Sequence, residues 1–254
     1  MPSPPSPPVE PIEPTPVQVR RWSRRAFAVW GAAGLAGLGG WRWLRTRAAD
    51  DGLPWPLRAA HRLNERVFGA AFSPSRLAPE SPPERAGEPK TNGHYGRPAP
   101  GSAVEPVRVE QPGESVRVFT AAQIVAGLPR VEMTTEFKCI EGWSQVVTWG
   151  GVSITDFVRK LGTNAGRHPY VSLETSDGDY YVGLDRAAAL HPQTLVCDRM
   201  NGAPLSHDHG GPLRLVTAVK YGIKNLKWLG RIRFQDERPI DFWAERGYDW
   251  YAGL

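Results

Sequence analysis

The chain has 254 residues, of which 41% are hydrophobic and 22% are charged, so it can form one large or two small globular domains. Its net charge of +5 arises in residues 1–47, which hold seven arginines against two glutamates, while the remaining 24 basic and 24 acidic residues cancel. A basic surface for nucleic acid is therefore excluded from the globular part, and we expect no nucleic-acid partner.

The N-terminal segment combines a proline-rich tail with a basic, apolar leader. Residues 1–19 cannot bury enough apolar surface to form a core and are predicted to be disordered. Ser23-Arg24-Arg25-Ala26-Phe27 has the twin-arginine form, and residues 26–41 are apolar, uncharged and rich in glycine. Residues 20–49 therefore resemble a twin-arginine export signal, which would carry a protein that is already folded.

The same segment is a poor candidate for an ordinary transmembrane helix. Sixteen helical residues reach roughly 24 Å, which is short of a hydrocarbon core of about 30 Å. A plain membrane anchor with a basic flank remains the alternative, and Thr46-Arg47-Ala48 is only a weak match to a signal-cleavage site. We expect a periplasmic protein that is exported folded and is anchored wherever its N-terminal segment stays uncleaved.

Residues 50–90 are typical of a linker that wraps the domain after it. Prolines recur through the segment, and one amphipathic helix is predicted near residues 57–72. The composition changes at Asn92-Gly93, a turn-forming pair that is followed by Tyr95 and Gly96. Residues 91–254 are then predicted to form a single domain.

Strand and helix patterns alternate through this domain. Thr120 can cap a short helix that stops at Gly127, and Ser153-x-x-Asp156 opens a second helix that ends at Gly162. Strands are predicted at residues 116–118, 131–138, 146–149, 170–174, 180–183, 194–200, 213–219 and 232–234. This mixture predicts an α+β domain with mixed β-sheets and short helices.

Cys139 follows directly on the strand predicted at 131–138, in which apolar and polar residues alternate. Glu141 and Trp143 come two and four residues later, so one segment presents a thiol, a carboxylate and an indole. A thiolate is a soft metal ligand, but an inert buried cysteine shows the same local pattern. The strand by itself leaves both interpretations open.

Two later stretches carry a resemblance to a known family. His209-Gly210-Gly211-Pro212-Leu213-Arg214 follows a turn at 201–205, and Lys220-Tyr221-Gly222-Ile223-Lys224-Asn225-Leu226-Lys227-Trp228 comes next. In this order after Cys139, these motifs resemble the molybdenum-pterin domain of the sulfite oxidase family, over about residues 91–254. The Cys-x-Glu-x-Trp spacing at 139–143 is similar to the reductase branch, the periplasmic protein-methionine-sulfoxide reductases, and not to sulfite oxidases proper.

The resemblance implies a single sulfite-oxidase-type domain that binds one mononuclear molybdenum with one molybdopterin. Cys139 would be the thiolate ligand of the metal, and Glu141 would be a catalytic proton donor if burial raises the pKa of its carboxyl group. Cationic side chains would hold the phosphate and the pterin. The cofactor contacts implied by the resemblance are Asn92, Tyr95, Gly96, Thr175, His209, Arg214, Asn225, Leu226 and Lys227.

Some of these side chains allow plainer interpretations. His207-Asp208-His209 could be half of a zinc site, although no second close pair of Cys or His completes it. Lys224 and Lys227 could be solvated surface charges, and Lys220 more so.

The two cysteines and the aromatic C-terminal segment also leave alternatives open. Cys197 is expected to be a buried thiol, but a Cys139–Cys197 disulfide in an exported protein would cancel the metal assignment. Residues 242–251 are dense in aromatic side chains, which are expected to pack across the domain surface. The alternative is a docking surface for an electron-transfer partner.

The resemblance implies oxygen-atom transfer at sulfur, as the reduction of a sulfoxide such as methionine sulfoxide, either small or protein-bound. A carboxylate at Glu141 would repel a sulfite dianion but suits a neutral sulfoxide. The alternatives are a sulfite dehydrogenase and a non-catalytic protein that carries the cofactor. Because the sequence shows no haem domain, we expect a membrane haem or quinol partner to supply electrons, and we expect a monomer.

Overall fold

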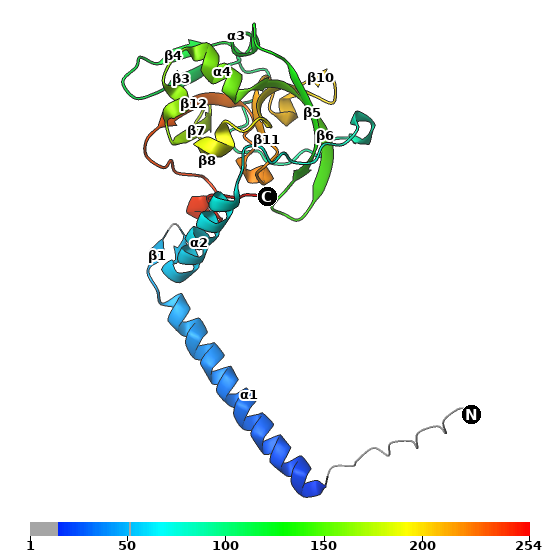
Figure 1. The fold of residues 1–254 in the computed structure, drawn as a ribbon, viewed down its shortest axis with the longest axis vertical. Helices are drawn as coiled ribbons and strands as arrows, with labels where there is room; N and C mark the ends of the chain where they lie inside the picture. The colour runs from blue at the N-terminus through cyan, green and yellow to red at the C-terminus, as the bar shows by residue number, and fades with distance from the viewer. Residues whose placement is uncertain (1–14, 51) are drawn as a thin grey trace, which may run out of the picture. The chain divides into compact units, whose positions relative to one another are not determined.

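The computed structural model describes residues 15–50 and 52–254 (Figure 1). The chain divides into two units, residues 1–49 with 54–56 and residues 50–53 with 57–254, and each is described here by itself. Most of the tail that was predicted to be disordered, residues 1–19, lies outside the described residues.

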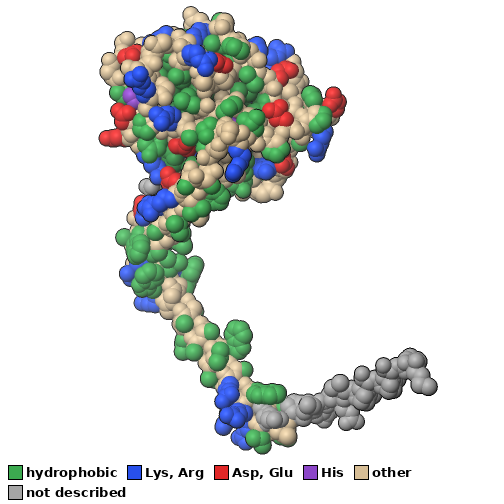
Figure 2. Space-filling model, in the orientation of Figure 1, with side chains coloured by type: hydrophobic (Ala, Val, Ile, Leu, Met, Phe, Trp, Pro, Cys, Tyr) green, Lys and Arg blue, Asp and Glu red, His purple; other side chains and the backbone are tan. Residues whose placement is uncertain are grey.

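One long helix, α1 (Pro16–Arg45), makes up most of the first unit. It begins inside the predicted tail, which corrects the boundary at residue 19, because proline suits the first helical position. Large hydrophobic side chains such as Phe27 and Trp30 are exposed along its length (Figure 2). Among the described residues, no helix is both long enough and apolar enough to cross a membrane. The short strands β1 (Ala49–Asp50) and β2 (Leu53–Pro54) follow.

The second unit contains two five-stranded β-sheets (Figure 1). The first has the order β10-β9-β6-β5, with β11 also paired to β9, and all its pairings are antiparallel. The second has the order β4-β3-β12-β7-β8, in which only β3 and β12 run parallel. The strands are β3 (Val107–Glu110), β4 (Arg117–Phe119), β5 (Val131–Lys138), β6 (Ser144–Ser153), β7 (Tyr170–Thr175), β8 (Tyr181–Asp185), β9 (Thr194–Met200), β10 (Ala203–Pro204), β11 (Arg214–Thr217) and β12 (Leu229–Gln235).

Helix α2 (Trp55–Ala71) precedes these strands, and shorter helices and turns join them. The shorter helices are α3 (Ala121–Val125), α4 (Ile154–Leu161) and α5 (Arg186–Ala189), with 3-10 turns η1 (Pro83–Arg85), η2 (Ala165–Arg167), η3 (His207–His209), η4 (Gly222–Lys224) and η5 (Ala244–Arg246). The predicted caps are confirmed, since Thr120 forms a capping box and Ser153 accepts from the backbone of Asp156, while Gly162 ends α4 in the left-handed region. The α+β class is confirmed as well. Neither β3 nor α5 was predicted, because four residues are too few to show a period.

The main core fills the space between the two sheets. Val152 and Leu215 from the first sheet pack with Leu173 and Ile232 from the second, and Phe157 of α4 covers them. A smaller apolar cluster that includes Met133, Val147 and Trp149 packs on the first sheet apart from this core. The strands are therefore rigid supports for the loops at their ends.

The segment after α2 runs along the β5–β6 hairpin. Ser81 N donates to Thr134 O (2.8 Å), and Lys90 N donates to Gln145 Oε1 (2.7 Å). The first contact covers the free edge of β5, and the second, to a side chain of β6, brings residues 91–96 to the end of the hairpin that carries Cys139.

Candidate active site

A single pocket gathers most of the side chains that the sequence singles out. It is lined by parts of segments 90–95, 137–149, 209–214 and 222–228, together with Met200, Tyr180 and Trp243. Of the predicted site residues, it brings together Asn92, Tyr95, Cys139, Glu141, His209, Arg214, Asn225 and Lys227. Three others, Gly96, Thr175 and Leu226, are not part of its lining.

Cys139 stands in a tight turn directly after β5. Its backbone N–H donates to Trp143 O (2.9 Å), and Gly142 N donates back to Cys139 O (3.1 Å). Gly142 can close this turn because its φ of 87° is accessible to glycine. The thiol is free and half-buried, and burial is the main cause that raises its pKa. Lys90 opposes this shift only weakly, so a bound metal would be needed to favour the thiolate.

Glu141 lies beside the thiol but is exposed. Its Oε2 accepts from Trp143 Nε1 (2.9 Å) and from Asn92 Nδ2 (3.2 Å), and Asn92 Nδ2 also lies 3.9 Å from Cys139 Sγ. The burial on which its expected role as a proton donor depended is therefore not found. The reason is local, because the turn at 140–142 projects the side chain from the rim of the pocket.

Arg214 is a buried cation in the lining of the pocket. Only 4% of it is exposed, and its guanidinium lies 4.7 Å from the ring centroid of Trp149. Nη1 donates to His209 O (3.0 Å), but Nε has no hydrogen-bond partner in the part of the chain that the structure describes. Burial lowers the pKa of Arg214 to about 10, so it stays charged at neutral pH. A buried charge with an unsatisfied donor favours an anionic ligand.

Lys227 extends the cationic wall. Its Nζ donates to Asn92 O (2.6 Å) and to Asp208 O (2.7 Å), so it ties the 91–96 turn to the 207–210 turn. Burial, then repulsion from Arg214, lowers the pKa of Lys227 to about 8. The pKa of His209 is also lowered, first by burial and then by these two cations. His209 is therefore a neutral hydrogen-bonding group at pH 7.

Gly96, Thr175 and Leu226 lie outside the lining and support the pocket from behind, while Asn225 lines the pocket and is held by the backbone. Gly96 has a φ of 72°, and a Cβ added there would lie 2.4 Å from the side chain of Thr175, so no other residue fits. Leu226 is fully buried in the main core, and its carbonyl accepts from Leu215 N (2.8 Å). Asn225 Oδ1 accepts from Thr217 N (2.8 Å).

Two lysines that were considered as solvated charges are buried, which corrects that alternative. Lys224 Nζ lies 2.5 Å from Asp241 Oδ2, with both side chains 1% exposed, and it also donates to Gly183 O (2.9 Å). Lys220 Nζ lies 3.6 Å from Asp185 Oδ2 and is likewise buried. Both lysines point away from solvent because the domain supplies a carboxylate for each, which the local sequence does not show.

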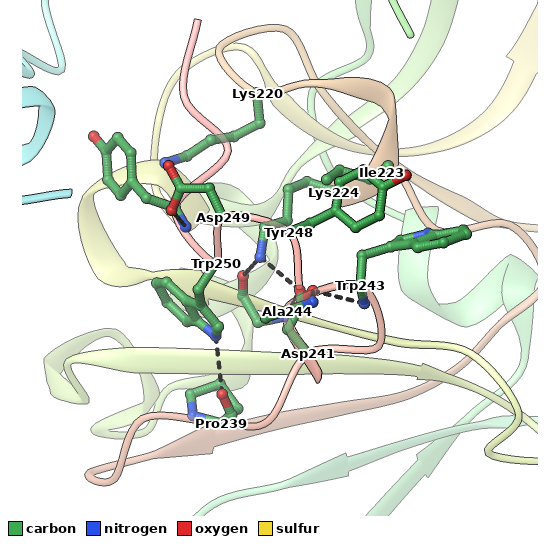
Figure 3. Close-up of polar contacts among 12 residues, drawn as sticks. Lys220, Ile223, Lys224, Pro239, Asp241, Trp243, Ala244, Tyr248, Asp249 and Trp250 are labelled. Atoms are coloured by element: carbon green, nitrogen blue, oxygen red, sulfur yellow. Dashed lines mark hydrogen bonds and ion pairs between the residues drawn. The ribbon is translucent and has the colours of Figure 1, made fainter. Parts of the chain in front are cut away.

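Asp241 connects this ion pair to the pocket wall. Its Oδ1 accepts from the backbone N–H groups of Trp243 (3.2 Å) and Ala244 (3.1 Å), and Lys224 approaches from the other side (Figure 3). Trp243 lines the pocket, as does Ile223 next to Lys224. The buried pair therefore holds together two segments that border the site.

Aromatic side chains form the remaining wall. Tyr95 packs against Phe242 (4.6 Å between ring centroids) and Trp243 (6.2 Å), which confirms that much of the C-terminal aromatic segment packs against the domain. Lys90 Nζ lies 4.5 Å from the ring centroid of Trp143. Sequence reasoning did not assign Lys90, Trp149 or Trp243 to the site. The aromatic density of residues 242–251 was the only signal for Trp243.

The structure bears on two alternatives to a metal-ligating Cys139, a disulfide with Cys197 and a zinc site. Both cysteines are free, so no Cys139–Cys197 disulfide forms. Cys197 is fully buried, as predicted, and burial raises its pKa to about 12. Among the described residues, no three His, Cys, Asp or Glu side chains are grouped to hold a metal ion, so the zinc alternative gains no support.

The chain is similar in sequence to known oxidoreductases. The family model described as "oxidoreductase molybdopterin binding domain" matches residues 104–243. A putative protein-methionine-sulfoxide reductase subunit, YedZ1, of Azospira oryzae is 33% identical over 212 residues, which are 80% of this chain and 78% of that protein. The protein-methionine-sulfoxide reductase catalytic subunit MsrP of Xanthomonas campestris pv. campestris is 30% identical over 150 residues, which are 54% of this chain and 45% of MsrP.

The similarity to solved structures is weaker. The crystal structure of the sulfane dehydrogenase SoxCD from Paracoccus pantotrophus aligns with 66% of this chain and 47% of that chain, at a TM-score of 0.48 and 17% identity. Similarity at this level supports no inference about the site. The chain spans about half the length of MsrP and of the SoxCD chain, but most of YedZ1.

Proposed function

Because the chain belongs to the family of oxidoreductases with a molybdopterin-binding domain, we propose that it reduces a sulfoxide, either of a small molecule or of a methionine side chain in a protein. The chain is an enzyme, and its cofactor is the molybdenum-pterin group of that family. The observation that carries the choice of substrate is the carboxylate of Glu141 beside the thiol of Cys139, with Asn92 Nδ2 between them.

The residues of the pocket fit that cofactor. Arg214 offers a buried charge with an unsatisfied Nε, which suits a phosphate. Cys139 offers a free thiol where the described residues hold no other cluster of metal ligands, so a metal bound there must draw its remaining ligands from a cofactor. When bound, the cofactor supplies two-electron oxygen-atom transfer at molybdenum.

We assign the roles of the chain's own residues accordingly. Cys139 would ligate the metal, and Arg214 and Lys227 would hold the phosphate and the pterin. His209, Asn92 and Tyr95 would contact the pterin from the sides of the pocket. The remaining predicted contacts, Gly96, Thr175, Asn225 and Leu226, would act through the backbone or by supporting these side chains.

The charge beside the thiol separates the two candidate substrates. An anionic Glu141 repels a sulfite dianion at close range but leaves a neutral sulfoxide unaffected. Trp143 and Trp243 add apolar walls that suit the carbon substituents of a sulfoxide, and aromatic rings contact sulfur favourably. Reduction of the sulfoxide to a sulfide and water consumes two electrons and two protons. We propose that a membrane haem or quinol supplies the electrons.

The test is a kinetic comparison of two substrates with the purified holoenzyme. With a reduced dye as electron source, we expect turnover of methionine sulfoxide, free or in a peptide, and little oxidation of sulfite with an acceptor dye. Rapid sulfite oxidation without sulfoxide turnover would reject the proposal in favour of a sulfite dehydrogenase.

We further propose that the folded protein is exported through its twin-arginine motif and remains near the membrane. The support is the Ser23–Phe27 motif, which lies within α1 and is followed in that helix by an apolar stretch and by arginines in the last turn. Fractionation of cells that express Arg24→Lys with Arg25→Lys is the test, and the double variant should stay in the cytoplasm. Normal delivery of the variant would refute this part.

A further inference from the structure

Helix α2 packs on its domain with its polar face inward. Arg58 is only 5% exposed, and its guanidinium donates to the carbonyls of Ala244 (2.7 Å), Tyr248 (2.9 Å) and Asp50 (3.3 Å). Two turns further along α2, Glu65 forms an ion pair with Arg238 (2.9 Å). Surface helices of globular proteins normally bury their apolar side, so this arrangement is reversed.

The opposite face of α2 presents an apolar strip. Leu57, Leu63, Val67 and Phe68 are 40%, 57%, 57% and 51% exposed. At 3.6 residues per turn they fall within an arc of about 140°, which holds no charged side chain of α2 and one polar side chain, Asn64. We call these four side chains the apolar strip. Exposing it to water is unfavourable, which points to a surface that covers it.

The charges around the strip identify the kind of surface. Arg66 lies exposed beside the strip in α2. The groove next to Phe68 and Ala71 is lined by the basic side chains of Arg76, Arg85 and Lys138 and by one acidic side chain, Glu136, which pairs with Lys138 at 3.7 Å. An apolar strip with a basic surround is complementary to anionic lipid headgroups over acyl chains.

The chain itself limits where α2 can be. Nine residues separate the last residue of α1 from the first residue of α2, and they can span at most about 30 Å. If the apolar leader is held in a membrane, as proposed above, α2 must stay within about 30 Å of that surface. A second copy is a poorer match. Each partner in a standard protein interface buries roughly 800 Å², and a strip one helix wide offers a smaller area than that.

We propose that α2 lies along the surface of an anionic phospholipid bilayer, with the apolar strip inserted below the headgroups. The proposal rests on the proposed location at a membrane but not on the substrate. Through Arg58, α2 is joined to the segment that follows Trp243, so docking of α2 keeps the pocket close to the bilayer. A membrane electron donor then needs to cover only a short distance to reach the site.

The experiment compares the full-length holoenzyme with two variants on vesicles. Leu63→Ser with Val67→Ser removes half of the strip, and Val104→Ser with Val116→Ser is the matched control, because both valines are exposed outside α2. Vesicles contain phosphatidylcholine alone or with 30% phosphatidylglycerol. Binding to the vesicles is measured by flotation. The solvent accessibility of α2 is measured by hydroxyl-radical oxidation of Leu57 and Phe68, which both variants retain.

We expect at least tenfold lower oxidation of Leu57 and Phe68 on phosphatidylglycerol vesicles, in the parent and in the control variant. The Leu63→Ser, Val67→Ser variant should lose most of this protection even if α1 keeps the variant bound to the vesicles. Because footprinting does not depend on turnover, it separates this proposal from the proposed reaction.

Three results would overturn the proposal. The first is a parent protein whose Leu57 and Phe68 are not protected, either because it fails to bind the vesicles or because it binds them through another surface. The second is equal protection without lipid at high protein concentration, which indicates self-association. The third is protection in native membranes but not on lipid vesicles, which indicates a membrane protein as the partner.

Discussion

The pocket has two walls of opposite construction. On one side, the turn at 139–143 is largely exposed and is held by two backbone hydrogen bonds and the contacts of Glu141. In another part of the lining, Arg214 and most of the segment 222–228 are buried, and they are supported by the buried Lys224–Asp241 pair. The difference separates two tasks, since the exposed turn presents reactive groups and the buried wall fixes a charged ligand in place.

The same contrast appears within a single motif. Lys220, Lys224 and Lys227 lie within eight residues, yet the first two face carboxylates in the interior and only Lys227 lines the pocket. Substitutions in the exposed turn should therefore change activity and leave stability unchanged. Substitutions behind the buried wall should do the reverse.

The largest expected effect is the loss of activity in Cys139→Ser. The thiol is half-buried in a turn that its backbone maintains, so the change should alter stability by less than about 1 kcal/mol. Molybdenum content, spectra and turnover of the purified variant are the measurements. Unchanged turnover and spectra would contradict the assignment of Cys139 as a metal ligand.

The other cysteine is the matched control. Cys197 is fully buried in the smaller apolar cluster, so Cys197→Ser buries a hydroxyl in an apolar site at a cost of about 1–3 kcal/mol. We expect this variant to unfold earlier in urea but to keep its turnover once folded. The two serine variants should therefore show opposite patterns.

The sequence predicts the residues that line the pocket better than the buried ion pairs that support it. Cys139, Glu141, His209, Arg214 and Lys227 belong to local motifs, and these motifs place them in one pocket. Asp241 and Asp185 could not be matched to their lysines, because each pairing joins residues that are 17 or 35 positions apart and depends on how the sheets pack. The orientation of α2 was hidden for a similar reason, since amphipathicity shows that a helix has two faces but not which one meets the domain.

Lys224→Met should produce the largest loss of stability. It leaves the carboxylate of Asp241 buried without its cation, which typically costs about 3–5 kcal/mol. Urea denaturation of the variant should show a lower midpoint at an unchanged slope. Lys227→Met is the control, because Lys227 belongs to the same motif but lines the pocket. It should weaken cofactor retention and lower the urea midpoint by a smaller amount.

A double variant tests the cause of that loss. Lys224→Met with Asp241→Asn leaves no lone charge in the interior, so it should regain part of the stability that the single variant loses. If Lys224→Met unfolds at the parent's midpoint, the buried pair does not support the pocket wall.

The smallest expected effect is a change in the pH dependence of stability, caused by Lys220. Burial lowers its pKa to about 8, partly offset by Asp185, while repulsion from Lys224 adds to the lowering. In the unfolded chain a lysine titrates near 10.4. Between these values the unfolded state binds more protons than the folded state, so this group makes the folded state more stable as the pH rises from about 8 to about 10. Below pH 8 both states are protonated and the cost of burying the charge is constant.

Lys220→Met should remove this dependence. The free energy of unfolding, measured by urea denaturation at intervals from pH 7 to pH 9.5, should rise more steeply in the parent than in the variant, by up to roughly 1.4 kcal/mol per pH unit. The ring centroid of Tyr251 lies 3.0 Å from Lys220 Nζ, and burial, then Asp185, raises the pKa of Tyr251 to about 12, above the unfolded value of about 10. Its titration lowers stability only towards the top of this pH range, and it is present in both proteins. Titration of Cys139 is common to both proteins and cancels in the difference. Parallel curves for the parent and the variant would show that Lys220 keeps its proton in the folded state throughout this range, and that its pairing with Asp185 outweighs its burial.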